Sequence, residues 1–464
     1  MPVSRERLWL GAAAVMLIGV DLGNRVLASN DEARFPLLAQ DILTRGAWLF
    51  PQLNGAPYLH KPVLVAWLIA LVSLPAGHVT QFTAALPLAL AALVTAFVIH
   101  ALGRELFGGS AGLLAGLVAL TTQGFVTFSR TPVPDMVMGA CISGSLWMLV
   151  RMTRGAPRAW IGFYGLAGLA FWTKGTAGLM PLVIALAWTL VSARPDKWRA
   201  LRLPRGALVL AAIVAPWWIG GLLVDAPAMR GVVVSDQLFW YLPRMPTPSA
   251  LALPVAHALG IVLPWTVIGP AALVGAVRAA RSSDPAREGV TFALVWAGLT
   301  LALVAISHEQ RFRYYLPLVP PVALLLGWWL ARAIAARRSA GRVFGVGWAL
   351  SALALLTAYH VEMRQQNADY DYPRLSATLQ EALGDPEPVA TWEIHHLPLA
   401  FYLGRPVRPI GDEADLQRAA AAPPHGVVIV RDATLAKMRE REGLIVLRRE
   451  RFAGRDISIV SRRM

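Results

Sequence analysis

The residues with the clearest potential for chemistry lie between Asp31 and Pro62, directly after the first apolar segment of the chain. This stretch gathers acidic, basic and aromatic side chains: Asp31, Glu32, Arg34, Asp41, Arg45, His60, Lys61, Phe35, Trp48, Phe50 and Tyr58. Charged groups in or beside a membrane are costly to keep, so such a cluster at a membrane face indicates a site for a charged substrate. The alternative interpretation is a solvated loop with ordinary surface charges.

Three side chains of this stretch suit the transfer of a group from a phosphate. The carboxylate of Asp31 has the chemistry of a general base for an acceptor hydroxyl. Arg34, three residues on, is suited to hold an anion through bidentate hydrogen bonds. Lys61 offers a compact positive charge for a phosphate, and Pro62 after it fits the first turn of a helix.

The composition is that of a multi-span membrane protein. Of 464 residues, 56% are hydrophobic and 15% are charged, and the mean hydropathy is +0.52, whereas about 25% of the residues in soluble domains are charged. The formal charge of +15 does not indicate a nucleic-acid partner, because residues 361–464 hold equal numbers of basic and acidic residues and the excess belongs to the membrane part. The single cysteine, Cys141, allows no intramolecular disulfide.

Apolar windows long enough to cross a membrane predict about 11 transmembrane helices. They lie near residues 8–28, 83–102, 111–128, 136–150, 160–173, 176–192, 206–223, 251–275, 289–306, 315–335 and 342–360. The first is predicted to be a retained signal-anchor. Val63 to Leu74 is apolar but short, which favours a juxtamembrane helix over a span. Residues 1–360 are therefore expected to form an all-α polytopic membrane domain.

Arginine is concentrated in the loops that alternate with these spans, which predicts a cytoplasmic N-terminus under the positive-inside rule. With that orientation, the clusters that combine acid, base and aromatic residues fall on the outer side, which in a bacterium is the periplasm: residues 31–61, 130–135, 174, 236–244 and 308–315. We expect them to contribute to one composite site. A transporter tends instead to place its ionisable groups near the bilayer midplane, in related halves.

From Tyr370 the composition becomes that of a soluble domain. Leu375, Leu379 and Leu383 keep a helical spacing, and the runs 427–430 and 457–460 are rich in β-branched residues. Residues 433–442 between them predict a further helix. Residues 361–464 are thus expected to form a small α/β domain on the periplasmic side, and no glycine-rich phosphate loop assigns it any chemistry.

Six motifs, taken in order, resemble the lipid-linked-sugar glycosyltransferases of the GT-C class, in the group of aminoarabinose transferases and protein O-mannosyltransferases. They are DEARF at 31–35, GAWLFPQLNGAPYLHKPVL, GRELFGGSAGLLAGL, SRTPVPDM at 129–136, WTKGTAGLMP at 172–181 and SHEQRFRYYLPLVPPVALLLG at 307–327. The resemblance covers residues 1–335. It implies a GT-C-like fold, a polyprenyl-phosphate sugar as donor and an active site on the outer face.

The resemblance also implies roles for single residues. Asp31 matches the catalytic acidic position, and Asp135 matches a second acidic position near the catalytic centre. The residues implied in binding the donor and acceptor are Glu32, Arg34, Tyr58, Lys61, Lys174, Arg311, Tyr314 and Tyr315. Where this chain has His60-Lys61-Pro62, the motif of aminoarabinose transferases looks like Glu-Lys-Pro. The resemblance implies that their glutamate can hold a metal together with a histidine of a later loop. His60 is the only candidate here for a divalent metal, since the later loop offers Asp236 and Gln237 without a histidine.

The function implied is an inverting, integral-membrane glycosyltransferase of the bacterial inner membrane that moves a sugar to an envelope acceptor. Aminoarabinose-type transfer to lipid A is the first expectation, and transfer to protein hydroxyls or to another envelope glycan is the second. Membrane lipids are the expected surroundings and nucleic acid is not an expected partner. A lipid or sugar flippase is the alternative from another class, because it also needs many spans and buried charges.

Overall fold

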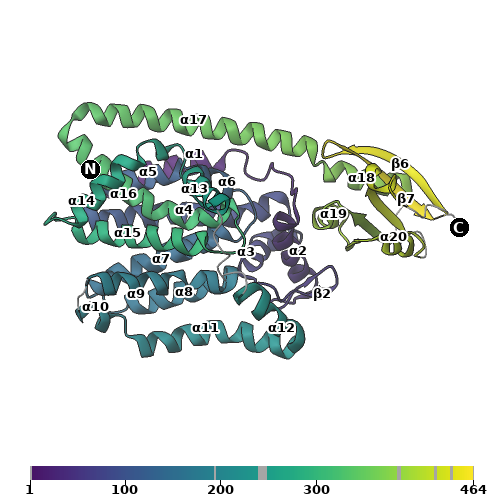
Figure 1. The fold of residues 1–464 in the computed structure, drawn as a ribbon, viewed down its shortest axis with the longest axis horizontal. Coiled ribbons are helices and arrows are strands. Elements are labelled where there is room, and N and C mark those ends of the chain that lie inside the picture. Colours follow the sequence, from purple (N-terminus) through teal and green to yellow (C-terminus); the bar gives the residue numbers. More distant parts are fainter. Residues whose placement is uncertain are drawn as a thin grey trace. The chain divides into compact units, whose positions relative to one another are not determined.

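The computed structural model describes residues 3–192, 195–238, 248–383, 388–422, 426–438 and 443–462. The chain forms two compact units, and Figure 1 shows the order of their elements. Unit 1 comprises Met1–Leu22, Leu59–Val65 and Ala85–Tyr359. Unit 2 comprises Gly23–Tyr58, Ala66–Ala84 and His360–Met464. Each unit is described by itself.

Unit 1 is helical, and its helices run roughly alongside one another in Figure 1. Its elements, of which α4 and α17 also extend into unit 2, are α1 (Val3–Gly19), α4 (Gln81–Phe107), α5 (Gly109–Leu120), α6 (Gln123–Phe128), α7 (Asp135–Thr153), α8 (Ala159–Lys174), η2 (Gly175–Leu179), α9 (Met180–Ser192), α10 (Pro195–Ala200), α11 (Leu203–Val224), α12 (Ala226–Val232), η3 (Val233–Leu238), α13 (Pro248–Ile261), η5 (Trp265–Val267), α14 (Gly269–Ala280), α15 (Arg287–Ala305), η6 (Phe312–Leu318), α16 (Val319–Ala336) and α17 (Arg338–Asp369).

Seven helical segments in the described part of the chain are long and apolar enough to cross a membrane. They are Gln81–Phe107, Asp135–Thr153, Ala159–Ser192, Asp196–Val224, Arg287–Ala305, Phe312–Ala336 and Arg338–Glu381. The expectation of a polytopic all-α membrane domain is confirmed, while the number of 11 spans stays a prediction. Residues 64–73 form the ten-residue helix α3, about 15 Å long and too short to span.

Three predicted spans are not single helices. The helix expected at 8–28 ends at Gly19, because Asp21 and Gly23 adopt positive φ angles of 57° and 86°. The span expected at 111–128 is divided, since Thr122 accepts a hydrogen bond from the backbone N–H of Phe125 and starts a new helix. The span expected at 251–275 is interrupted between α13 and α14, where Pro264 cannot donate a helical hydrogen bond.

Small residues allow α4, α5 and α16 to pack closely. A Cβ at Gly103 of α4 would lie 2.9 Å from the Cα of Gly112 in α5, and a Cβ at Gly327 of α16 would lie 2.7 Å from the Cβ of Ala115 in α5. Close backbone approach at small residues is the usual way in which membrane helices associate. Larger residues at these positions would force the helices apart.

Arg130 connects the turn before α7 to the end of α1 through hydrogen bonds. Its side chain is buried and donates hydrogen bonds to the carbonyl oxygens of Leu17 and Val20, the latter at 2.8 Å from Nε. Carbonyl groups at a helix C-terminus lack partners within the helix, and an arginine satisfies them well. The positively charged side chain of Arg130 therefore stabilises the C-terminal end of α1.

Unit 2 is an α/β unit. Its elements are α2 (Asn30–Arg45), β1 (Gln52–Leu53), β2 (Ala56–Pro57), α3 (Leu64–Ser73), η1 (Leu74–Ala76), α18 (Tyr372–Leu383), β3 (Val389–Trp392), α19 (His396–Leu403), β4 (Val407–Pro409), α20 (Glu413–Ala420), β5 (Val427–Arg431), α21 (Asp432–Leu435), β6 (Leu444–Phe452) and β7 (Arg455–Arg462). The strand order is β4-β3-β5-β7-β6. Strands β3, β4 and β5 are parallel, and β7 pairs antiparallel with β5 and β6.

The predicted small C-terminal α/β domain is confirmed, including strands at 427–430 and 457–460 and the helix with Leu375 and Leu379 on its buried face. The helix predicted at 433–442 is only the short α21, and residues 439–442 lie outside the described part. The predicted boundary between 360 and 361 stays a proposal, since the compact unit also contains residues 23–58 and 66–84.

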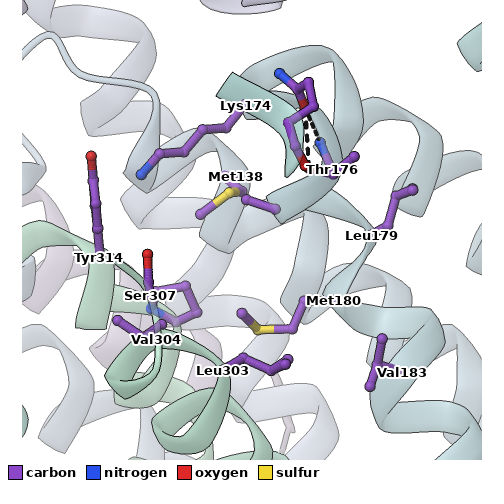
Figure 2. A pocket seen from close by; sticks show the side chains of 13 residues that line it. Met138, Lys174, Thr176, Leu179, Met180, Val183, Leu303, Val304, Ser307 and Tyr314 are labelled. Atoms are coloured by element: carbon purple, nitrogen blue, oxygen red, sulfur yellow. Dashed lines mark hydrogen bonds between the residues drawn. The ribbon is translucent and has the colours of Figure 1, made fainter. Parts of the chain in front are cut away.

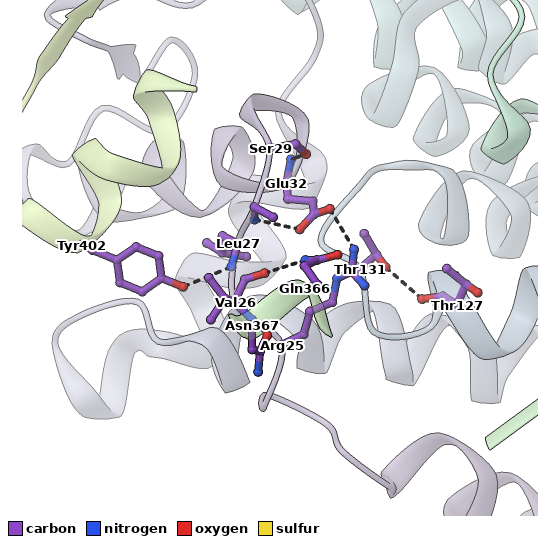
Figure 3. A network of polar contacts seen from close by, with 11 residues as sticks. Arg25, Val26, Leu27, Ser29, Glu32, Thr127, Thr131, Gln366, Asn367 and Tyr402 are labelled. Carbon is purple, nitrogen blue, oxygen red and sulfur yellow. Dashed lines mark hydrogen bonds and ion pairs between the residues drawn. The ribbon is translucent and has the colours of Figure 1, made fainter. Parts of the chain in front are cut away.

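Helix α2 belongs to this unit because it packs on α19. Leu27 and Ala33 form a buried apolar cluster with Leu397 of α19, and Leu37 and Phe401 pack at its edge. Figure 3 shows the polar contacts that hold the chain just before α2: Val26 donates its backbone N–H to Asn367 at 2.9 Å and accepts a hydrogen bond from Gln366 at 3.0 Å, and Leu27 donates to the Tyr402 hydroxyl at 3.1 Å. The position of α2 within unit 2 thus depends on the C-terminal segment.

Candidate functional site

Unit 1 holds a buried charge cluster, which we call the Asp135 cluster, consisting of Asp135, Lys174, Arg313 and Tyr314. Asp135 is fully buried, and its Oδ1 lies 2.6 Å from the Lys174 ammonium nitrogen while its Oδ2 lies 3.4 Å from Arg313 Nε. The Lys174 ammonium is also 3.7 Å from the centre of the Tyr314 ring. Asp135 thus gathers two cationic side chains at one place, and such groups suit an anionic ligand.

The helix ends explain why these charges sit where they do. Asp135 is the first residue of α7, where the helix dipole favours a negative charge, and Lys174 is the last residue of α8, where it favours a positive one. Gly175 turns the chain with φ +67°, and a Cβ there would collide with the Gln237 amide. Glycine is therefore required immediately after the lysine.

A cavity of about 250 Å³ opens beside this cluster. Figure 2 shows the Lys174 side chain reaching toward Tyr314 and Ser307, with a wall of methionine, leucine and valine side chains next to them. The polar lining residues are Lys174, Thr176, Gln237, Ser307 and Tyr314, and the apolar ones include Met138, Leu179, Met180, Val183, Leu303 and Val304. The cavity thus offers a positive end and an apolar wall.

The short η3 segment closes one side of this cavity. Gln237 Oε1 accepts hydrogen bonds from the Thr176 backbone N–H at 2.9 Å and from the Thr176 hydroxyl at 3.0 Å. The expected outer cluster at 236–244 is therefore represented by Asp236 and Gln237, and residues 239–244 lie outside the described part.

His60 and Asp236 form a second polar pair in unit 1, with His60 Nδ1 3.1 Å from Asp236 Oδ2. Burial acts to raise the pKa of the Asp236 carboxyl, but hydrogen bonds from His60 and Ser235 and the positive charge of Lys61 outweigh it and hold that pKa below its usual value. Asp236 is therefore an anion at neutral pH, and its negative charge interacts with the positive charge of Lys61.

This pair does not by itself make a metal site. The candidate ligand His60 has Asp236 of a later loop beside it. No group of three or more histidine, cysteine or acidic side chains that could hold a metal occurs in the residues that the structure describes. Zinc sites use three or four protein ligands, and the described part of the chain brings together fewer than that at His60 and Asp236.

Unit 2 contains the other predicted catalytic carboxylate. Asp31 lies in the first turn of α2, and its Oδ1 accepts a hydrogen bond of 3.0 Å from Arg34 Nη1. The two side chains are 21% and 23% exposed, respectively. Asp31 thus keeps access to solvent, in contrast to the fully buried Asp135.

Glu32, the next residue, is buried and holds the preceding loop. Its Oε1 accepts a hydrogen bond from Arg25 at 3.0 Å, and its Oε2 accepts one from the Ala28 backbone at 3.2 Å (Figure 3). Tyr58 is also buried, and its backbone N–H donates to Pro51 at 2.9 Å across the β1–β2 hairpin. These contacts indicate structural uses for both residues, and their predicted contact with substrate stays a prediction.

Not all the side chains of the 311–315 motif that were expected to bind substrate line the cavity. Tyr314 lines the cavity, but the fully buried Tyr315 donates its hydroxyl to Gln310 at 2.6 Å. Arg311 lies just before η6, and it is Arg313, which the sequence analysis did not select, that pairs with Asp135. The two arginines are two residues apart, and only the geometry of the η6 turn distinguishes them.

Comparison with known proteins agrees with this geometry. The family model described as dolichyl-phosphate-mannose-protein mannosyltransferase matches residues 60–219. The undecaprenyl phosphate-α-4-amino-4-deoxy-L-arabinose arabinosyl transferase of Pseudomonas aeruginosa strain UCBPP-PA14 is 30% identical over 377 residues, which are 76% of this chain and 66% of that protein. The protein of the same name from Pectobacterium atrosepticum is 28% identical over 326 residues, 68% of this chain and 57% of the relative. The chain therefore spans less than two thirds of the length of these relatives.

Solved structures share the fold. The crystal structure of ArnT from Cupriavidus metallidurans bound to undecaprenyl phosphate superimposes with a TM-score of 0.79 at 18% identity, covering 98% of this chain and 97% of that one. The Archaeoglobus fulgidus oligosaccharyltransferase in complex with zinc and sulfate gives a TM-score of 0.62 at 14% identity, covering 92% of this chain and 68% of that one.

Proposed function

Because the chain belongs to the GT-C lipid-linked-sugar glycosyltransferases, in the group of aminoarabinose transferases and protein O-mannosyltransferases, we propose that it transfers a sugar from a polyprenyl-phosphate donor to an envelope acceptor. The donor sugar is 4-amino-4-deoxyarabinose and the acceptor is lipid A. The names of the relatives support this choice of donor.

The observation that carries the proposal is the cavity beside the Asp135 cluster. A polyprenyl phosphate has an anionic head and a long apolar tail, and the cavity offers a positive end at Lys174 next to a wall that includes Met180 and Leu303. The phosphate is already a leaving group, so no nucleotide-binding loop is needed. Ligand sites of this kind combine an apolar lining with a few placed polar groups.

The reaction breaks the bond between the anomeric carbon and the phosphate oxygen and forms a bond from that carbon to an acceptor oxygen. Negative charge develops on the departing phosphate, and we assign its stabilisation to Lys174 and Arg313. The resemblance of their motifs alone adds Lys61 and Arg34. Attack from the side opposite the phosphate inverts the anomeric carbon. The polyprenyl phosphate is released as the second product.

Asp31 is assigned the role of general base. Its carboxylate is partly exposed and its partner Arg34 fixes its orientation. A hydroxyl acceptor transfers its proton to Asp31 as the new bond forms, whereas a phosphate of lipid A is already anionic and needs orientation more than deprotonation. Asp135 is assigned a positioning role, because it holds Lys174 and Arg313 in place.

A protein or another envelope glycan is the second candidate acceptor. The family model that matches residues 60–219 is described by protein mannosylation, and this favours a hydroxyl acceptor. In that case the deprotonation by Asp31 becomes essential to turnover.

The test is transfer by the full chain reconstituted in lipid nanodiscs with radiolabelled undecaprenyl-phosphate aminoarabinose. Label appearing on added lipid A supports the first candidate, and label on a protein or glycan from an envelope extract supports the second. If label crosses the bilayer of proteoliposomes without joining any acceptor, the transferase assignment is wrong and the protein is a flippase.

The distribution of arginine further supports an inner-membrane protein whose active site and C-terminal domain face the periplasm. A reporter fused after Arg338 is expected to be cytoplasmic and one fused after Gln366 periplasmic. Alkaline phosphatase and green fluorescent protein fusions measure this directly. If both fusions report the same side, the predicted span count is wrong by one.

A further inference from the structure

Unit 2 contains a cavity of about 190 Å³ to which the proposed transfer gives no role. At about 30 Å³ each, six water molecules would fill it. It lies where the start of α18, the β3–α19 turn, the end of β5 and the β6–β7 turn meet, and it is lined by Tyr370, Tyr372, Glu393, Ile394, His395, Arg431, Phe452, Ala453, Arg455 and Ile457.

The polar lining is predominantly basic. Arg431 and Arg455 come from neighbouring strands, and His395 lies just before α19. Glu393 accepts a hydrogen bond from Thr434 at 2.7 Å, and its Oε2 lies 3.6 Å from Arg431 Nη1, which is too far for a hydrogen bond. Arg455 makes no ion pair or side-chain hydrogen bond within the described ranges, so its guanidinium donors are available to a ligand.

A buried phenol points to a ligand independently of these charges. Tyr372 is 0% exposed and its ring packs edge-on against Phe452 at 4.7 Å. Its oxygen lies near the backbone of His395 but makes no hydrogen bond of normal geometry with any residue that the structure describes. A buried donor without an acceptor is destabilising, and an oxygen atom of a ligand would satisfy it.

The backbone beside the cavity supports the same interpretation. Ala453 has a φ of +52°, which the two-residue β6–β7 turn with Gly454 explains. Glu393 has a φ of +60° at the end of β3, outside any hairpin. A glutamate in this region is strained, and such strain is concentrated at functional sites.

We propose that this cavity binds a phosphorylated monosaccharide. Arg431 and Arg455 hold the phosphate, because guanidinium groups match its oxygens bidentately. Tyr372 donates to a phosphate or ring oxygen, and Glu393 accepts from a sugar hydroxyl. The rings of Tyr370 and Phe452 cover the apolar face of the sugar. The same chemical group occurs in a free sugar phosphate and in the head of a phosphorylated glycolipid.

Isothermal titration of the full chain in detergent tests the proposal with glucose 1-phosphate, inorganic phosphate, glucose and lipid A micelles as probes. Glucose 1-phosphate is expected to bind more tightly than inorganic phosphate, and glucose not at all. Because lipid A is also the proposed acceptor, binding of the micelles without binding of glucose 1-phosphate supports the site only if Arg455→Gln weakens it, and then identifies a glycolipid as the ligand. Micelle binding that Arg455→Gln leaves unchanged belongs to the transfer site and overturns the proposal. Equal binding of phosphate and glucose 1-phosphate, or binding of none of the phosphorylated probes, overturns the proposal.

Variants connect binding to the cavity. Arg455→Gln is expected to weaken glucose 1-phosphate binding at least tenfold, whereas Arg462→Gln, the same change on the same strand away from the cavity, leaves it unchanged. Tyr372→Phe is expected to weaken binding about fivefold without lowering the melting temperature of the ligand-free protein, since it removes a buried donor that lacks an acceptor. If Tyr372→Phe lowers the melting temperature and leaves binding intact, the hydroxyl is structural and the site is refuted.

Discussion

Two carboxylates that the sequence nominated for catalysis, Asp135 in unit 1 and Asp31 in unit 2, have opposite surroundings. Asp135 is 0% exposed and lies between Lys174 and Arg313. Asp31 is 21% exposed at its side chain and is paired with Arg34 on the same helix. A fully buried carboxylate that pairs with two cations is poorly placed to exchange a proton with a substrate, while a partly exposed carboxylate is better placed to do so.

The comparison teaches that burial, more than residue type, separates a chemical role from a positioning role. Removing one partner of a buried ion pair leaves an uncompensated charge and is costly to the fold, whereas the loss of an exposed pair costs little. Substitution of Asp31 should therefore mainly lower turnover, and substitution of Asp135 should mainly lower stability.

The largest expected effect is on turnover in Asp31→Asn. This change keeps the size of the side chain but removes its basicity, and we expect a loss of about 10² to 10⁴ in kcat for a hydroxyl acceptor. Donor binding and melting temperature should stay at the parental values. Asp41→Asn, an acid-to-amide change on the same helix, is the matched control for turnover. If Asp31→Asn is fully active and a folded Asp135→Asn is inactive, the base has been assigned to the wrong unit.

Next in size is the stability of Asp135→Asn. The change removes the fully buried carboxylate that pairs with Lys174 and Arg313, and we expect a loss of about 3 to 5 kcal/mol in the free energy of unfolding. Thermal or denaturant unfolding in detergent measures it. Asp284→Asn, which breaks a pair with the exposed Arg332, should cost no more than about 1 kcal/mol. Equal losses in the two variants would contradict the importance of burial.

A smaller effect is expected on donor binding in Lys61→Ala. Loss of a charge-assisted contact to the donor phosphate should raise the dissociation constant about 10- to 100-fold, since such contacts contribute about 1.5 to 3 kcal/mol. Direct titration with undecaprenyl phosphate measures this. Lys437→Ala, on the exposed surface of unit 2, is the control. Unchanged donor affinity in Lys61→Ala would leave Lys61 as an interfacial anchor.

The smallest effect concerns pH. Burial, then the charges of His395 and Arg34, lower the pKa of His396 to about 4 from 6.5. Between pH 6.5 and 4 the unfolded chain binds the proton and the folded one does not, so the free energy of unfolding should fall as the pH drops through this window. Solvent screening of this half-buried side chain limits the fall to about 1 kcal/mol. His396→Asn should flatten that slope in unfolding measurements at a series of pH values. A slope identical to that of the parent would show that other groups cause it.

The sequence was sufficient for the fold class because its signals are local. Apolar windows predict helices, alternating β-branched runs predicted β5 and β7, and the motifs around Asp135 and Lys174 indicated residues that the fold brings within 2.6 Å. Helix interruptions were missed where turn residues such as Asp21 and Pro264 outweigh the hydropathy of their neighbours.

The long-range arrangement could not be predicted from local patterns. Nothing in the motif at 307–315 distinguishes Arg311 from Arg313, since the choice depends on which side of η6 faces α7. Likewise, helix α2 was assigned to the membrane domain because it follows the first apolar segment, whereas its contacts with α19 place it in the unit of the C-terminal sheet.

The hydrogen bond between Val26 and Asn367 also bears on when the folded enzyme is completed during synthesis. The two residues are 341 positions apart, and a ribosome adding about 5 to 20 residues each second needs roughly 20 to 70 s to pass from one to the other. During that interval the segment before α2 lacks the side chains that hold it. The surroundings of Asp31, the assigned general base, are therefore complete only when synthesis of the chain is nearly finished. A nascent or truncated enzyme is expected to be inactive in the membrane.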